Sequence, residues 1–161
     1  MKRVKIITLV MMLILLASCS GNNAARQSSA PEKETVNAEE STDMISVTML
    51  INDEKVDVTW ENNESAEALA ELVSDSPLTI DMSMYGGFEQ VGALGTDLPS
   101  SDINITTKPG DIMLYTGSNI VVFYGSNSWA YTSLGHIENK SADELKEILG
   151  SDNVKITLSA E

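Results

Sequence analysis

The sequence predicts a mainly β fold, a closed or nearly closed barrel of about eight strands with two short α-helices, preceded by a signal peptide and a polar linker. Short apolar runs rich in β-branched and aromatic residues recur along residues 44–161 and are separated by closely spaced turns. An amphipathic helical pattern occurs only twice. Residues 110–137 contain runs that are apolar on both faces, which is typical of strands in the middle of a barrel or of a covered sheet.

The N-terminus has the pattern of a secretory signal. Lys2, Arg3 and Lys5 precede an apolar run over residues 6–17 that is too short to span a bilayer. The run ends in LASC, residues 16–19, which resembles the bacterial lipoprotein signal. The resemblance implies cleavage after residue 18, a diacylglyceryl thioether and palmitate on Cys19, and tethering to the membrane through these acyl chains. The alternative is an ordinary signal peptide that happens to end near a cysteine.

The lipoprotein interpretation also predicts where the protein is found. Cys19 is the only cysteine, so an intramolecular disulfide is excluded and the residue stands where the lipid would be attached. We therefore expect a protein of the cell envelope, anchored to the outer face of the cytoplasmic membrane, or to the outer membrane if the source is Gram-negative.

Charge and composition divide the rest of the chain. Without residues 1–18, which contain three of the ten basic residues and none of the 24 acidic ones, the net charge changes from −14 to about −17. Such a charge disfavours binding to nucleic acid or direct adsorption to an anionic membrane surface. Residues 19–43 are polar and lack periodicity, which predicts a lipid-anchored disordered linker. Residues 44–161 are long enough for one domain with a single core.

In the first half of this domain, strands are expected at residues 45–51 and 56–60, joined by a turn at 52–54. Apolar residues at helical spacing predict a helix over residues 65–74, ended by Pro77. Strict alternation over residues 78–84 predicts a half-buried strand. Residues 85–92 are punctuated by glycines and are expected to form a loop, and residues 103–106 a short strand.

The second half is dominated by a predicted β-hairpin. Its strands are residues 111–116 and 120–124, with a three-residue loop at 117–119, and residues 129–137 form a third strand. Ser141 and Glu144 have the spacing of a capping box, which opens a short helix with Gly150 as its stop. A closing strand is expected over residues 154–158.

The sequence lacks the motifs of most metal-binding, catalytic and cofactor-binding sites. The chain has one histidine, His136, and its only cysteine is assigned to lipid, so a zinc or copper cluster is not expected. His136 lies within a predicted strand, where it is best interpreted as a strand residue and not as a catalytic base. No calcium-binding loop, phosphate-binding loop or dinucleotide motif is found. The sequence thus predicts no cofactor, no metal and no catalytic residue.

A ligand groove is the remaining candidate site. Aromatic residues beside polar anchors follow the hairpin and occupy the glycine-rich segment, and together they could line a concave apolar site. The candidate residues are Tyr85, Phe88, Glu89, Gln90, Tyr124, Asn127, Trp129 and Tyr131. The alternative is structural: Tyr124 and Trp129 would be core aromatics, and Asn127 a turn residue with positive φ.

The phrases GDIMLY and IVVFYGSNSWAYTSLGHI, with the terminal KITL strand after a short helix, resemble the small bacterial cyclophilin-like domains. The resemblance covers residues 45–158 and is most specific over 110–137. It implies a closed eight-stranded barrel with helices at its ends and a relationship to the peptidyl-prolyl isomerases. Because some members are joined to flavodoxin-like domains, it also suggests a flavodoxin-like redox protein as a partner, on family association alone.

The catalytic residues of cyclophilins do not carry over to this chain. The arginine that holds the prolyl peptide is missing, because the only arginine after the signal peptide is Arg26 in the linker. Phe88 and Gln90 are two positions apart where cyclophilins have three, and after Trp129 the next histidine is His136. The sequence therefore predicts a non-catalytic binding domain for a peptide or small ligand. The alternative is a weak prolyl isomerase that assists the folding of exported proteins.

Overall fold

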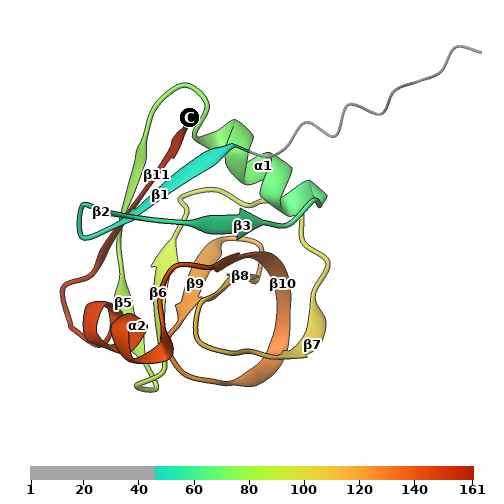
Figure 1. Ribbon diagram of the computed structural model, residues 1–161. Helices are drawn as coiled ribbons and strands as arrows, with labels where there is room; N and C mark the ends of the chain where they lie inside the picture. The colour runs from blue at the N-terminus through green and yellow to red at the C-terminus, as the bar shows by residue number, and fades with distance from the viewer. Residues whose placement is uncertain (1–45) are drawn as a thin grey trace, which may run out of the picture. The chain divides into compact units, whose positions relative to one another are not determined.

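The computed structural model describes residues 46–161 (Figure 1). The lipoprotein signal over residues 1–18, Cys19 and the linker over residues 19–43 lie outside the described residues.

A four-stranded antiparallel sheet contains both ends of the described chain. Its order is β2-β1-β11-β4, with β1 at Val47–Ile51, β2 at Glu54–Val56, β4 at Leu78–Asp81 and β11 at Lys155–Ala160. Along β1 the side chains of Val47, Met49 and Ile51 are buried, as alternation along a strand requires. Asn52 and Asp53 turn the chain into β2 with φ values of 49° and 68°, the left-handed conformation that two-residue hairpin loops need.

A second, seven-stranded sheet carries the rest of the strands. Its order is β3-β10-β8-β9-β6-β5, and β7 pairs with β10 off this path. The bounds are β3 Val58–Trp60, β5 Ser83–Tyr85, β6 Glu89–Ala93, β7 Ile103–Thr106, β8 Asp111–Tyr115, β9 Asn119–Phe123 and β10 Ser128–Ile137. The predicted hairpin is thus β8 and β9, and the predicted third strand is β10. Figure 1 shows β10 as a strongly bent ribbon.

Two predicted strands are each divided between the two sheets. Residues 56–60 form the end of β2 and all of β3, with a break at Asp57, and residues 78–84 form β4 and β5, with a break at Met82. At both breaks the backbone leaves its ladder for a new partner: Glu138 N donates to Asp57 O at 2.8 Å, and Met82 N donates to Val154 O at 2.9 Å. Strands that bend in this way form the corners where two packed sheets exchange strands.

The prediction of a mainly β fold with two helices is confirmed, but its details differ. Residues 46–161 contain eleven strands in two sheets, and their hydrogen-bonded ladders do not join into one closed eight-stranded barrel. The predicted loop at residues 85–92 is also wrong in part, because residues 89–93 form β6, which pairs with both β5 and β9.

Both helices are confirmed, with capped N-termini. The side chain of Asn63 accepts a hydrogen bond from Ala66 N at 3.0 Å at the start of α1, Glu64–Leu72. Ser141 and Glu144 form the predicted capping box of α2, Ala142–Leu149, and Gly150 follows its last turn. Neither helix in this part of the chain is long and apolar enough to cross a membrane.

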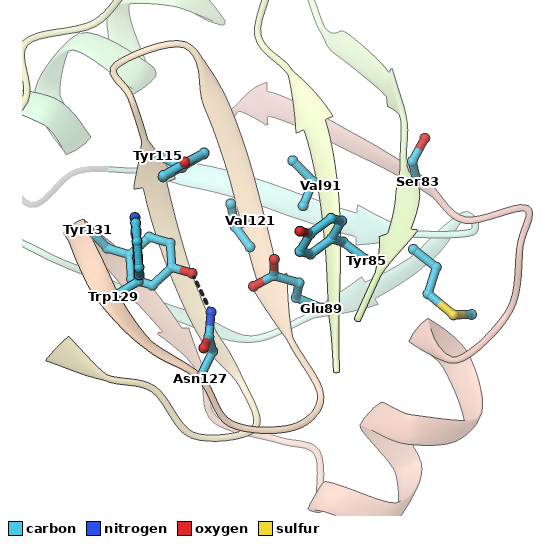
Figure 2. A pocket seen from close by; sticks show the side chains of 10 residues that line it. Ser83, Tyr85, Glu89, Val91, Tyr115, Val121, Asn127, Trp129 and Tyr131 are labelled. Carbon is cyan, nitrogen blue, oxygen red and sulfur yellow. Dashed lines mark hydrogen bonds between the residues drawn. The ribbon is translucent and has the colours of Figure 1, made fainter. Parts of the chain in front are cut away.

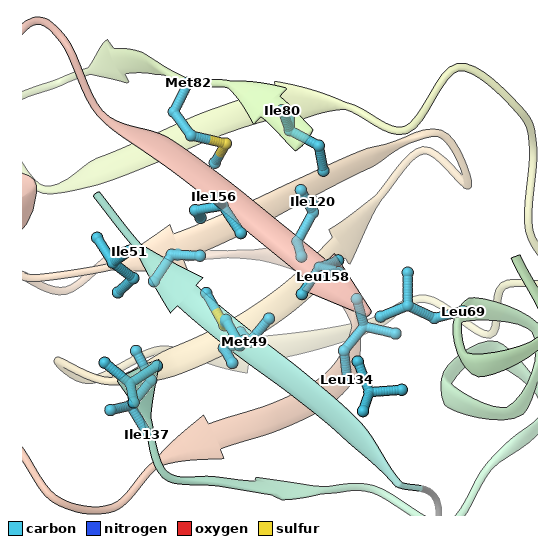
Figure 3. Packing of buried hydrophobic residues seen from close by; sticks show 14 of the residues in the cluster. Met49, Ile51, Leu69, Ile80, Met82, Ile120, Leu134, Ile137, Ile156 and Leu158 are labelled. Carbon is cyan, nitrogen blue, oxygen red and sulfur yellow. The ribbon is translucent and has the colours of Figure 1, made fainter. Parts of the chain in front are cut away.

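The main core lies between the two sheets (Figure 3). Met49, Ile51, Ile156 and Leu158 come from the small sheet; Ile120, Leu134 and Ile137 come from the large one; and Leu69 comes from α1. A smaller cluster of Met113, Val121, Phe123 and Tyr131 packs on the other face of the large sheet. The central strands of this sheet are therefore covered on both faces, as their sequence predicts.

The close approach of β3 to β10 gives the first prediction. A Cβ atom at Gly135 would lie 2.7 Å from the carbonyl oxygen of Thr59 and 3.2 Å from Trp60 Cα, and backbone atoms cannot yield as a side chain can. Replacing Gly135→Ala should lower the free energy of unfolding by about 1–3 kcal/mol, measured by urea unfolding. Ser126→Ala, in an exposed turn, is the control and should have no effect. Equal unfolding midpoints for both variants would contradict this interpretation.

Candidate functional site

A pocket of about 520 Å³ opens on the face of the large sheet that lies away from the main core. Alternation along the strands decides which side chains reach it. On β6, Glu89 and Val91 line the pocket, whereas Gln90 and Gly92 between them do not. On β9, Val121 lines the pocket, and its neighbours Ile120 and Val122 belong to the main core.

Aromatic side chains surround this pocket (Figure 2). Tyr85 ends β5, and Trp129 lies near the start of β10; they are 66% and 58% exposed. They are two of the four large hydrophobic side chains exposed in the described part of the chain, and a third, Met84, also lines the pocket. Exposed apolar side chains gathered around one concavity are a common feature of binding sites.

Tyr131 organises the floor of the pocket. Its ring centroid lies 5.8 Å from that of Tyr115 and 5.5 Å from that of Phe123, with an edge-on arrangement in the second pair. Asn127 Nδ2 donates a hydrogen bond to the Tyr131 hydroxyl at 3.0 Å, shown as the dashed line in Figure 2. Asn127 is itself held, since its backbone N donates to Thr107 Oγ1 at 3.0 Å. The packing of the Tyr131 ring and the hydrogen bond from Asn127 together hold the Tyr131 hydroxyl in place.

Among residues 46–161, Glu89 is the one carboxylate that lines this pocket. The residue is 5% exposed, and its Oε2 atom has no hydrogen-bond partner within residues 46–161. Burial raises the pKa of the Glu89 carboxyl, and the Tyr131 hydroxyl acts in the opposite direction. Burial first, and then the charge of Glu89, raise the pKa of Tyr131. The pocket thus combines aromatic walls with one desolvated acid, and no Lys, Arg or His of the described part of the chain lines it.

The structure brings five of the eight predicted groove residues together. Tyr85, Glu89, Asn127, Trp129 and Tyr131 all line the pocket. The structural alternative is wrong for Trp129, whose side chain is largely exposed, and for Asn127, whose φ is not positive.

The other three predicted residues have structural positions. Phe88 is half-buried beside the smaller cluster, and Tyr124 is buried in the main core, as the alternative interpretation holds. Gln90 is fully buried, and its Nε2 donates to the carbonyl oxygens of Leu149 at 2.6 Å and Ser151 at 2.9 Å. Gln90 therefore ties the C-terminal end of α2 to the large sheet.

Five lining residues were not predicted from the sequence: Ser83, Met84, Val91, Tyr115 and Val121. Tyr115 and Val121 lie in strands that are apolar on both faces, so alternation does not tell which face holds a site. Ser83 and Met84 follow the break at Met82, which no turn residue marks.

His136 lies apart from the pocket and has a structural partner. Its Nδ1 atom lies 2.8 Å from Asp111 Oδ1, and the other carboxylate oxygen of Asp111 accepts from Lys108 N at 2.8 Å. The pair links β10 to the turn that precedes β8. Among residues 46–161, no group of three His, Cys, Asp or Glu side chains is placed to hold a metal ion.

Comparison with known proteins agrees with this architecture. A model of the cyclophilin-like family matches residues 49–159. The solution structure of a hypothetical protein from Archaeoglobus fulgidus is similar in fold, with a TM-score of 0.50 and 15% sequence identity, covering 71% of this chain and 93% of that one. No curated protein matches the chain.

The position of Gln90 gives a second prediction. Gln90→Met keeps the length of the side chain but removes the donor to the buried carbonyl oxygen of Leu149, at the end of α2, and to the carbonyl oxygen of Ser151. The free energy of unfolding should fall by about 1–3 kcal/mol, and amide hydrogen exchange at the end of α2 should become faster. Ligand binding in the pocket should be unchanged, since Gln90 does not line it. A variant with normal stability but impaired binding would instead make Gln90 a ligand-contacting residue.

Proposed function

Because the chain belongs to the cyclophilin-like family, we propose that its domain is a non-catalytic binding module for a peptide or small ligand, held at the cell envelope by acyl chains on Cys19. The main support for a binding function is the pocket itself. Its volume of about 520 Å³ falls in the range of small-molecule sites, and exposed Tyr85 and Trp129 stand at its edge.

The donors that prolyl isomerisation needs support the proposal of a non-catalytic domain. A twisted prolyl peptide bond is stabilised by a preorganised donor, for which cyclophilins use an arginine. Residues 46–161 contain no arginine, and none of their five lysines lines the pocket. Within residues 46–161, the lining of the pocket includes the acid Glu89 and no cationic donor that could take the place of that arginine. The geometry therefore favours binding over the alternative of a weak isomerase.

The binding proposal predicts that Trp129 and Tyr85 carry ligand affinity. We suggest NMR titration of the purified full-length chain, in a non-ionic detergent, with blocked Ala-Xaa-Pro-Ala peptides in which Xaa is apolar, acidic or basic. At least one peptide should shift signals of β5, β6 and β10, and Trp129→Leu should weaken its binding about tenfold. Exchange spectroscopy on the same samples should show no acceleration of cis/trans exchange.

The matched control for this titration is Ile103→Ser. Ile103 is 62% exposed, like Trp129, but lies outside this pocket, so its replacement should leave affinity unchanged. Faster prolyl exchange would establish the isomerase instead. Shifts in the pocket that Trp129→Leu leaves unaltered would show that these aromatics do not form the site.

The anchoring proposal rests on the LASC sequence that ends at Cys19. Expressed in a bacterium, the full-length chain should incorporate labelled palmitate and sediment with membranes. Cys19→Ala should abolish the label, because the thioether needs the thiol, whereas Ser20→Ala should retain it. A wild-type chain that is secreted without label would support the ordinary signal peptide instead.

A further inference from the structure

The buried carboxyl group of Glu89 has no counter-charge among the described residues that line the pocket. A carboxylate transferred out of water is costly unless a counter-charge or hydrogen-bond donors replace the water. Within residues 46–161, Glu89 is 5% exposed, its Oε2 atom has no hydrogen-bond partner, and no cationic side chain lines the pocket around it. Buried polar groups without partners are few in native proteins, and each of them calls for an explanation. A ligand that supplies a positive charge would provide one.

The walls of the pocket have the matching property. Tyr85, Tyr115, Trp129 and Tyr131 come from three strands and line the same cavity as Glu89. The faces of aromatic rings attract cations, and several rings around one site are the arrangement that recognises alkylammonium groups. In Figure 2, Trp129 and Tyr131 lie across the pocket from Glu89 and Tyr85. A neutral apolar ligand would contact the same rings but would give Glu89 no counter-charge, so burial would continue to favour its protonated form.

The charge of the domain acts in the same direction. Residues 46–161 contain 19 acidic and five basic residues. Three of the basic residues, Lys55, Lys140 and Lys155, already pair with surface acids. The potential around the domain is therefore negative, which concentrates cations near its surface and repels anions.

We propose that the pocket binds an organic cation, with an alkylammonium group placed between the Glu89 carboxylate and the rings of Tyr115, Trp129 and Tyr131. This deepens the proposed function and rests on it, since it names the chemical class of the ligand. The group can belong to a free small molecule or to a lysine side chain in a peptide, and the two sources share the same chemistry.

The test compares a cation with its neutral isostere. Choline and 3,3-dimethyl-1-butanol have the same shape and differ in the charge of one central atom. We suggest titrating each into the full-length chain in non-ionic detergent at low ionic strength, with the indole N–H signals of the two tryptophans as the readout. Choline should shift the Trp129 signal at concentrations at least about tenfold lower than the alcohol. The Trp60 signal is an internal control, because its Nε1 donates to Val47 O at 2.8 Å away from the pocket.

Two variants assign the effect to particular residues. Glu89→Gln keeps the volume of the side chain and removes its charge, so it should reduce choline affinity about tenfold and leave that of the alcohol unchanged. Glu138→Gln removes one negative charge at an exposed position and should change neither. Trp129→Leu, at an exposed site where folding is not at stake, should weaken both ligands. Thermal unfolding of each variant checks that the fold is intact.

The pH dependence gives a separate check. Only the ionised carboxylate attracts the cation, so choline affinity should fall as the pH decreases through the raised pKa of Glu89. The titratable side chains that line the pocket with Glu89 are Tyr85 on β5, Tyr115 on β8 and Tyr131 on β10. Tyr124 after β9 lies in the main core, where burial first, and then the charges of Glu89 and Asp152, raise its pKa further above its ordinary value. In Glu89→Gln the affinity should be independent of pH over the acidic range.

The outcomes separate this inference from the proposed function. Equal affinity for choline and the alcohol, or full choline affinity in Glu89→Gln, would overturn the cation site and leave the binding module standing. Failure of choline, the alcohol and every blocked peptide to shift the Trp129 signal would overturn both. If choline is selected over the alcohol, a comparison of blocked Ala-Lys-Pro-Ala with blocked Ala-Gln-Pro-Ala shows whether a lysine in a peptide serves as the source.

Discussion

The fold depends on hydrogen bonds that a single strand shares with three others. β10 pairs with β8 along its centre, with β3 at its end and with β7 at its start. Leu134 and Ile137 of this strand fill the main core, and Trp129 and Tyr131 line the pocket on the other face. To serve all three partners the strand must bend, and its register with β8 shifts between Ser133 and Gly135. The same bend allows the core and the pocket to be built from one continuous segment.

Much of this arrangement could be predicted from local pattern. Alternation, turn residues and caps indicate most strands and both helices, because each signal acts over a few neighbouring residues. The corners at Asp57 and Met82 could not be predicted in this way. Each break is a single residue whose role is set by partners far along the chain, Glu138 for Asp57 and Val154 for Met82. Strand β6 could not be predicted either, because its Gly92 is typical of a loop in local pattern, whereas in the structure it packs against Ile80 and Met82.

In the candidate site too, local pattern predicts some residues, whereas others depend on strand pairing. Three pocket residues lie beside turns: Tyr85, Asn127 and Trp129. They could be predicted as site residues because binding residues lie disproportionately on loops. Gln90 could not be separated from Glu89 by composition, since only the pairing of β6 decides that one faces α2 and the other the pocket. A shift of the strand register by one residue would exchange every side chain of β6 between the two faces of the sheet.

The pairing of β1 with β11 joins the beginning and the end of the domain. Val47 lies opposite Ala160 and Ile51 opposite Ile156, contacts that span more than a hundred positions of sequence. A chain synthesised from its N-terminus cannot complete the small sheet until its final strand has been made, so β1 lacks its partner β11 until then. For a chain that is exported unfolded through a narrow channel, as the proposed location at the cell envelope implies, such an order of assembly would be an advantage. The native state can form only after the last residues have come through, so premature folding does not block the passage.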